Sequence, residues 1–160
     1  MNLAEYRRMF EVEDIHWWYV GLHDLILRSV KMESHLIGRP LQILDAGCGT
    51  GRLLQRLSEY GDAEGCDASE EAVRYCHMRG VKAEVADLNE LHLKADSYDV
   101  ITSIDVLYHA GIKDDVDVLK RFYTGLKPGG VLIINLVAFE SLRSSHDIAV
   151  HTRERYSRQT

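Results

Sequence analysis

Three glycines at alternate positions, Gly47, Gly49 and Gly51, follow closely after a short aliphatic run that begins at Leu41. Glycine permits positive φ angles and allows the backbone to approach a ligand closely. An acidic residue, Asp45, stands two positions before the first of these glycines. The segment therefore predicts a buried strand, a ligand-binding turn and the start of a helix, with a carboxylate beside the turn that suits a cationic ligand.

Two further acidic residues stand where the next strands of such a fold would end. Asp67 closes the expected strand 63–66, and Asp87 closes the expected strand 82–86. In doubly wound sheets, ligands bind outside the carboxyl ends of the strands. We therefore expect these two carboxylates and that of Asp45 to converge on one crevice.

The spacing of the glycines distinguishes two classes of ligand. A dinucleotide site has the pattern G-x-G-x-x-G, and Arg52 occupies the place of its third small residue. The pattern found here is G-x-G-x-G with Asp45 upstream. It resembles the first motif of the class I S-adenosylmethionine-dependent methyltransferases, and in particular their small-molecule branch.

The resemblance covers about residues 13–157. Segment 98–109 is similar to the fourth-strand motif of that family, and segment 126–130 is similar to its turn before the fifth strand. The resemblance implies that Asp67 binds both ribose hydroxyls, which a carboxylate suits because it only accepts hydrogen bonds. It also implies that Asp87 lies near the adenine amino group.

The resemblance implies a full set of site residues. Those expected to bind the donor are Asp45, Gly47, Gly49, Gly51, Asp67, Ala68, Asp87, Leu88 and Ile104. Those expected to contact the acceptor are Trp17, Tyr108, His146, Arg155 and Tyr156. His109 is the first candidate for a general base, because an imidazole titrates near neutral pH. His16 and His146 are weaker candidates, and the spacing of the histidines predicts no metal site.

The elements that would position these residues alternate along the chain. Such alternation predicts an α/β fold: a doubly wound, mostly parallel sheet with helices on both faces, of the Rossmann-like methyltransferase kind. We expect helices in segments 3–34, 50–60, from Ser69 onward and 114–126, and strands at 41–44, 63–66, 82–86, 98–104 and 131–134.

One domain is expected, in three parts. Residues 1–38 form a helical cap, residues 39–138 form the donor-binding core, and residues 139–160 follow the fifth strand. The family sheet has a sixth strand and an antiparallel seventh, and neither fits after Arg143. We therefore expect the C-terminal strands to be missing and the fifth strand to be an open edge, where a second copy would pair to form a homodimer.

Composition excludes several other classes of protein. The 160 residues carry a net charge of −6, and the acidic groups concentrate in the centre of the chain, which argues against nucleic acid as a partner. No apolar run approaches the roughly 20 residues of a membrane helix, so stable membrane insertion is not expected. The three cysteines lack paired metal spacing, which favours a reduced, cytoplasmic location.

The sequence thus predicts transfer of a methyl group from S-adenosylmethionine to a small-molecule acceptor by in-line displacement. The acceptor and its nucleophilic atom stay open. Two alternatives also stay open. One is a donor-binding fragment or regulatory module without catalysis. The other is a nicotinamide-dependent oxidoreductase, which Arg52 disfavours.

Overall fold

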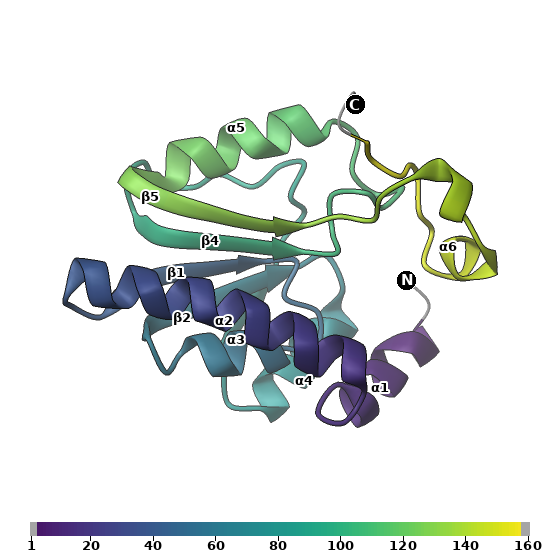
Figure 1. Cartoon of the computed structure of the whole chain (residues 1–160), viewed down its shortest axis with the longest axis horizontal. Helices are drawn as coiled ribbons and strands as arrows, with labels where there is room; N and C mark the ends of the chain where they lie inside the picture. The colour runs from purple at the N-terminus through teal and green to yellow at the C-terminus, as the bar shows by residue number, and fades with distance from the viewer. Residues whose placement is uncertain (1–2, 158–160) are drawn as a thin grey trace.

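The computed structural model describes residues 3–157, apart from the side chains of residues 3, 4 and 146. Its centre is a five-stranded parallel sheet with the order β3-β2-β1-β4-β5 (Figure 1). The order reverses between β1 and β4, so the switch point of a doubly wound sheet lies at their carboxyl ends. The strands are β1 (Leu41–Ala46), β2 (Gly61–Asp67), β3 (Lys82–Val85), β4 (Tyr98–Ile104) and β5 (Leu126–Asn135).

Helices cover both faces of the sheet, as the alternation predicts. Helices α2 and α3 pack on one face, and α5 packs on the other. The helices are α1 (Leu3–Val12), α2 (Trp17–Ile37), α3 (Arg52–Leu57), α4 (Glu70–Met78), α5 (Asp115–Gly125), a 3₁₀ turn (Glu140–Leu142) and α6 (Ser145–Ala149). No helix in the described part of the chain is long and apolar enough to cross a membrane.

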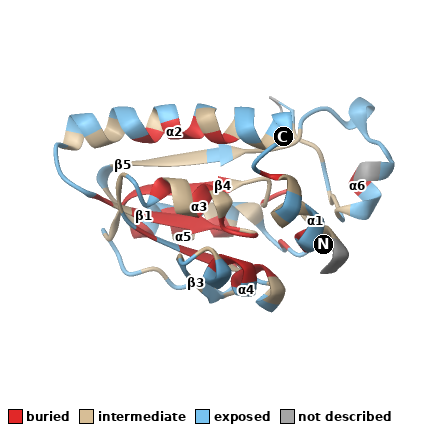
Figure 2. Ribbon diagram, turned by 90° about the horizontal axis from the view of Figure 1, so that it is seen from below, coloured by how far each residue is buried: buried red, intermediate tan, exposed pale blue. Residues whose placement is uncertain are grey.

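Strand β1 lies in the centre of the sheet and is buried on both faces. Leu41 and Ile43 pack in the hydrophobic cluster under α2 and α3, whereas Leu44 and Ala46 pack in the cluster under α5. Figure 2 shows this burial along the central strands, with exposure on the outer side of α2. Burial on both faces explains why the strand is a short aliphatic run rather than an alternating one.

Helix α4 begins where the sequence predicts. The hydroxyl of Ser69 accepts a hydrogen bond from the backbone N–H of Ala72 at 3.3 Å. Glu70 and Glu71 follow in the first turn, where the helix dipole favours acidic side chains. This cap fixes the direction in which α4 leaves the end of β2.

Strand β5 is longer than expected. The segment 126–130, expected as a turn, is part of the strand and contains an irregularity in register. Tyr98 pairs with Leu126, but Val100 pairs with Val131, so the residues between them bulge out of the ladder. Within residues 3–157, β5 pairs with β4 and forms one edge of the sheet.

Candidate functional site

The glycine turn after β1 adopts a conformation that requires glycine. Gly47, Gly49 and Gly51 have φ angles of 84°, 54° and 82°. A Cβ atom at Gly47 would lie 2.3 Å from a methyl carbon of Val106, and one at Gly51 would lie 2.8 Å from the Cys76 sulfur. The turn is therefore packed closely against the loop after β4 and against α4, as a tight ligand-binding turn needs.

Asp67, at the end of β2, holds this turn in place. Its Oδ2 accepts a hydrogen bond from the backbone N–H of Gly49 at 3.0 Å, and its Oδ1 accepts one from the N–H of Ser69 at 2.9 Å. Burial is the main cause that raises the pKa of Asp67. A carboxylate has about four lone-pair sites, so acceptor capacity is left for a ligand.

Asp45 does not line an open crevice, which differs from the expectation for this residue. It is 1% exposed, and its Oδ1 accepts a hydrogen bond from the hydroxyl of Thr102 at 2.6 Å. Burial raises the pKa of Asp45 to about 7. The cause is strand alternation, which places Asp45 on the same covered face as Leu41 and Ile43.

Asp87 and Leu88 differ in their surroundings. The exposed Asp87 accepts hydrogen bonds from the backbone and side-chain nitrogens of Asn89 at 2.9 and 2.6 Å, and Asn89 also contacts the backbone oxygen of Gly111 at 2.8 Å. Leu88 is buried in the core cluster under α5. Its side chain is therefore engaged in packing, in contrast to the contact with the donor that the sequence predicts for it.

The remaining donor-site candidates lie beside this edge. Ala68 is exposed and follows Asp67 directly. Ile104 ends β4 and packs partly against the core cluster under α2. Of these positions, Asp67 is the one whose side chain hydrogen-bonds to the glycine turn.

Tyr108 and His109 follow β4 on the same edge. Tyr108 is buried, and His109 is half-buried with its ring against the backbone of Val150 and Asp105. Burial is the main cause that lowers the pKa of His109, so the imidazole is neutral at pH 7. The backbone of His109 also forms an isolated bridge with Thr152, which draws the segment after β5 over this edge.

Arg155 and Tyr156, expected at the acceptor, bind to the protein itself. The guanidinium of Arg155 donates two hydrogen bonds to Asp147, at 2.8 and 3.0 Å, and Asp147 is 2% exposed. The hydroxyl of Tyr156 donates to Asp115 at 2.5 Å. Arg155 therefore braces the segment 139–157 internally, and Tyr156 fastens that segment to α5. Spacing in the sequence reveals neither role.

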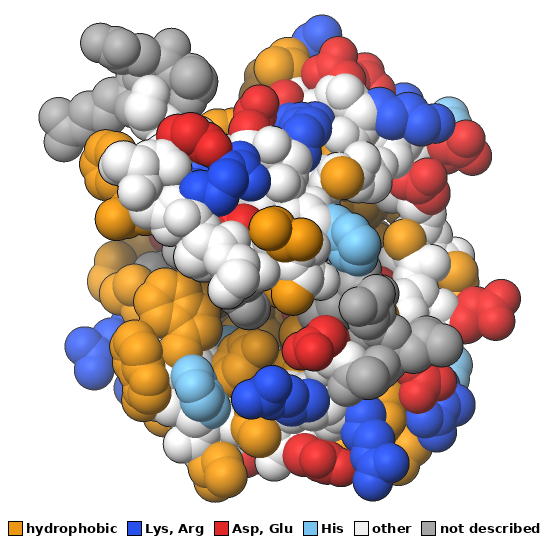
Figure 3. All heavy atoms as spheres, turned by 90° about the vertical axis from the view of Figure 1, so that its right-hand side faces the viewer, with side chains coloured by type: hydrophobic (Ala, Val, Ile, Leu, Met, Phe, Trp, Pro, Cys, Tyr) orange, Lys and Arg blue, Asp and Glu red, His pale blue; other side chains and the backbone are white. Residues whose placement is uncertain are grey.

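Trp17 and His146 complete the expected acceptor set. Trp17 is 74% exposed at the start of α2, next to the exposed Trp18. The side chain of His146 lies outside the described residues. Figure 3 faces the carboxyl edge of the sheet and shows apolar side chains gathered on the side where α2 begins, with a recess between them and the segment after β5.

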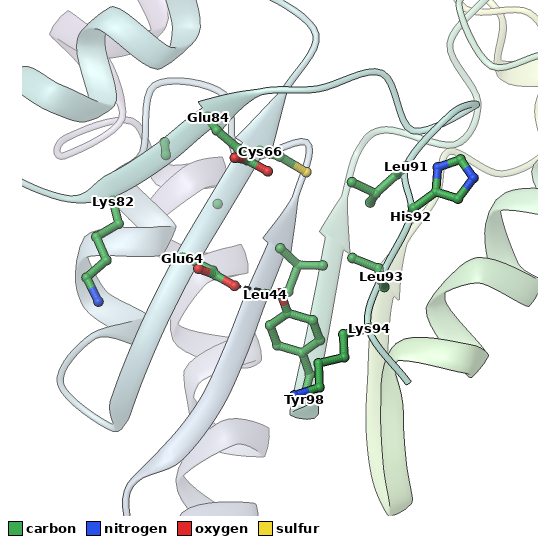
Figure 4. Close-up of a pocket in the computed structure, with 12 residues that line it drawn as sticks. Leu44, Glu64, Cys66, Lys82, Glu84, Leu91, His92, Leu93, Lys94 and Tyr98 are labelled. Atoms are coloured by element: carbon green, nitrogen blue, oxygen red, sulfur yellow. Dashed lines mark hydrogen bonds between the residues drawn. The ribbon is translucent and has the colours of Figure 1, made fainter. Parts of the chain in front are cut away.

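A second concave region lies away from this edge. It has a volume of about 260 Å³ and lies over β2 and β3, where the connection 86–97 contains no helix (Figure 4). The hydroxyl of Tyr98 donates to Glu64 across it at 2.6 Å. None of the expected site residues lines it, so it is distinct from the glycine-turn site.

Comparison with known proteins identifies the family. A family model described as a methyltransferase domain matches residues 44–134, more than half of the chain. The chain belongs to the methyltransferase domain family. Its methyl donor is accordingly S-adenosylmethionine, and the match spans the glycine turn, Asp67 and Asp87.

Three curated relatives differ in the acceptors that their names state. Phosphoethanolamine N-methyltransferase 3 of Arabidopsis thaliana is 32% identical over 122 residues, which are 71% of this chain and 24% of that protein. The probable tRNA methyltransferase 9B of Homo sapiens is 35% identical over 99 residues, 61% of this chain and 22% of that protein. The ubiquinone biosynthesis O-methyltransferase of Ralstonia nicotianae is 28% identical over 137 residues, 76% of this chain and 56% of that protein.

A solved structure supports the same fold. The S-adenosylmethionine-dependent methyltransferase from Mesorhizobium loti is 31% identical, with a TM-score of 0.55 over 59% of this chain and 45% of that chain. The chain thus spans from about a fifth to just over half of the length of the curated relatives it matches.

The residues at the edge fit this donor. Its ribose presents two neighbouring hydroxyls, and Asp67 keeps acceptor capacity beyond its two backbone hydrogen bonds. The missing side chains of Gly47 and Gly51 allow Val106 and Cys76 to pack against the turn, which fixes its shape beside Asp67. Burial and two backbone N–H groups, rather than a Lys or Arg side chain, are the main influences on the pKa of Asp67, which suits a ligand that brings positive charge.

Two residues of the edge escaped the sequence analysis. Asp105 has a φ angle of 58°, which is unusual for a residue other than glycine, and Tyr19 lies in the first turns of α2. Asp105 stands within the fourth-strand motif and Tyr19 directly follows Trp18. The sequence contains both residues, but only the fold places Asp105 just after the carboxyl end of β4 with its backbone in the left-handed region.

Proposed function

We propose that the protein transfers a methyl group from S-adenosylmethionine to a small-molecule acceptor at the carboxyl edge of its sheet. The observation that carries the proposal is the link between Asp67 and the turn, where the carboxylate accepts the N–H of Gly49 at 3.0 Å. In this proposal residues 1–38 cover the donor, residues 39–138 bind it, and residues 139–160 contribute to the acceptor pocket.

The donor, when bound, supplies a sulfonium-activated methyl group. The chain contributes binding, alignment and exclusion of water. Asp67 binds the ribose, Asp87 lies near the adenine amino group, and the glycine turn allows the backbone to approach. Correct alignment raises the effective molarity of two reactants to roughly 10⁵–10⁸ M, so no strong acid or base has to drive the reaction.

His109 acts as the general base where the acceptor retains its proton until attack. Burial lowers its pKa, so the neutral imidazole is present at pH 7 and is ready to accept a proton. Its position next to Tyr108, at the end of β4, supports this role. The role of Tyr108 and Trp17 is to line the space that the acceptor enters.

The small-molecule nature of the acceptor is supported by charge. The net charge of −6 opposes a polyanion such as tRNA, whose binding depends on clustered Lys and Arg. Two of the curated relatives are named for small acceptors, and the third is named for tRNA. We favour a small molecule on the strength of the acidic centre of the chain.

Isothermal titration calorimetry tests the proposal. We expect S-adenosylmethionine and S-adenosylhomocysteine to bind and NAD to give no heat. Tight binding of NAD without binding of the other two would reject the proposal in favour of an oxidoreductase. Binding of the donor without turnover of any acceptor would favour the second candidate, a donor-binding module without catalysis.

A further inference from the structure

A buried ion pair joins three separate segments of the chain beside the glycine turn. Glu13 directly follows α1, Arg79 directly follows α4, and the two pair at 2.5 Å with side chains that are 4% and 9% exposed. Thr50, between Gly49 and Gly51 in the turn, is fully buried. Its hydroxyl donates to Oε1 of Glu13 at 2.6 Å, and its backbone oxygen accepts a hydrogen bond from Nε of Arg79 at 3.0 Å. Both partners of the ion pair therefore hold the same residue of the turn.

The guanidinium of Arg79 is fixed by further partners at the end of α1. It lies 4.3 Å from the centroid of the Phe10 ring, and its Nη2 donates to the backbone oxygen of Phe10 at 3.4 Å. Its Nη1 lies 3.9 Å from a carboxylate oxygen of Asp14. Because a planar guanidinium presents its N–H groups in fixed directions, partners on several sides determine its position and it determines theirs.

Helix α1 lies against both the turn and α4. A Cβ atom at Gly49 would lie 3.4 Å from the sulfur of Met9. On α4, Tyr75 packs with Tyr6, and its ring stacks on that of Phe10 at 4.7 Å between centroids. The ion pair closes this circle of contacts, because it joins the end of α1 and the end of α4 to the turn. The turn therefore cannot change its shape without a change in the docking of α1.

Stability alone does not explain such a pair. The cost of removing two charges from water roughly offsets their attraction, and apolar side chains of similar volume are often as stabilising. What the pair adds is a fixed geometry, and a turn of glycines needs it because glycine has great conformational freedom. Asp67 holds Gly49, whereas the ion pair holds Thr50. Two neighbouring residues of the turn are thus fixed from different elements.

We propose that Glu13 and Arg79 are positioning residues of the donor site. Through Thr50 they fix the shape of the glycine turn, and they make that shape depend on the docking of α1. The inference rests on the proposed function and adds to it two residues that act through the turn. A site that is ordered before its ligand arrives loses less freedom on binding and so binds more tightly. Coupling of this kind is reciprocal, so a ligand bound at the turn also holds α1 in place.

Substitutions at Thr50 test the contact between the turn and the ion pair. Thr50→Val removes the hydroxyl that donates to Glu13 and keeps a side chain of the same shape. By calorimetry, we expect its affinity for S-adenosylhomocysteine to fall about tenfold. Thr50→Ser keeps the hydroxyl and should stay within about twofold of the parent. Rescue by serine distinguishes a positioning hydroxyl from a side chain that only fills space.

A double variant tests the ion pair itself. Glu13→Leu with Arg79→Met removes both charges together, so no buried charge is left unpaired. We expect its affinity for S-adenosylhomocysteine to fall about tenfold as well. Adding Thr50→Val to this variant should weaken binding by no more than about a further twofold, because the hydroxyl has already lost the carboxylate through which it acts.

A matched control is the ion pair between Arg56 and Asp24. It also joins a helix of the N-terminal part to the rest of the domain, at 2.7 Å, but it links α2 to α3 rather than α1 to the turn. Arg56→Met is therefore expected to bind S-adenosylhomocysteine like the parent. An equal loss of affinity in this control would mean that any loosening of the N-terminal helices weakens binding, and it would overturn the role of Glu13 and Arg79.

Amide hydrogen exchange measures the coupling directly. In the parent, S-adenosylhomocysteine should slow exchange in the turn, residues 47–51, and also in α1, residues 3–12. In the double variant, the ligand should slow exchange in the turn, and its effect on α1 should be lost. A loss of stability alone would speed exchange in α1 with and without the ligand and would leave the effect of the ligand in place.

The outcomes separate this inference from the proposed function. Absence of S-adenosylhomocysteine binding in the parent overturns the proposed function, and the positioning role falls with it. If the parent binds and the folded Thr50→Val protein binds equally well, the positioning role is wrong while the proposed function stands. The role is also wrong if Thr50→Ser loses as much affinity as Thr50→Val, or if the ligand leaves exchange in α1 of the parent unchanged. These last results decide the question even where the double variant fails to fold.

Discussion

The two ends of the sheet treat their carboxylates in opposite ways. At the amino end, Asp99 accepts hydrogen bonds from Arg39 at 2.9 and 2.7 Å and from Lys127 at 3.0 Å. These hydrogen bonds and charges hold the pKa of Asp99 well below its usual range. At the carboxyl end, Asp45 and Asp67 are hydrogen-bonded to a hydroxyl and to backbone N–H groups, and burial raises the pKa of both.

The difference teaches how to separate a structural acid from a functional one. The charge of Asp99 is matched by its own chain, so the residue stabilises the fold. Asp67, at the glycine turn, has no basic side chain as an ion-pair partner among the described residues, and its charge is available to a cationic ligand, whereas Asp45 is buried and hydrogen-bonded to Thr102. Three predictions test this contrast, from the largest expected effect to the smallest.

Asp45→Asn is expected to remove a pH dependence of stability. The folded-state pKa of Asp45 is about 7 against an ordinary value of 3.8, so the folded state holds an extra proton between these values. The contribution of that proton to the free energy of unfolding of the parent falls as the pH rises from about 4 to about 7. Relative to the parent, the free energy of unfolding of the variant should rise by about 2–4 kcal/mol between pH 4 and pH 8. Urea denaturation measures it, and a difference that is constant with pH would contradict the burial of Asp45.

Asp99→Asn is expected to have the opposite pH signature. The folded-state pKa of Asp99 is lowered, so its contribution is present above the unfolded pKa and is lost as pH falls. Loss of the ion pairs at pH 7 should cost about 2–3 kcal/mol of unfolding free energy. The affinity for S-adenosylhomocysteine should stay unchanged, and a large loss of that affinity would break the contrast between the two ends.

Much of the fold follows from the sequence, because β1 contains a short aliphatic run before the glycine turn and β2 ends at an acidic residue, Asp67. Strand β4 has the predicted bounds, and Ser69 caps α4 as predicted. The sequence does not predict the bulge in β5, because Pro128 and the two glycines after it normally end a strand or a helix. Here they form a bulge, and pairing with β4 resumes at Val131.

The site is harder to predict than the fold. The direction of Asp45 follows from counting alternate residues back to Leu41, and that signal was available. The pairing of Arg155 with Asp147 could not be predicted, since an arginine beside a tyrosine in the sequence equally fits a contact with a ligand.

Asp87→Ala is expected to have the smallest effect. The side chain is exposed and hydrogen-bonds to Asn89, so its contact with the adenine amino group is screened by water. We expect the affinity for S-adenosylhomocysteine to fall by no more than about fivefold, or roughly 1 kcal/mol. A loss as large as that for Asp67 would mean that the two acids share one role.

The most direct test of the account is the affinity of Asp67→Ala for S-adenosylhomocysteine, measured by calorimetry beside Asp99→Asn. Circular dichroism establishes that both variants are folded. The account predicts that Asp67→Ala loses at least about tenfold in affinity, or roughly 1.4–3 kcal/mol for a charged acceptor, while Asp99→Asn binds like the parent. Parental affinity in a folded Asp67→Ala protein would contradict the assignment of the donor site to the carboxyl edge.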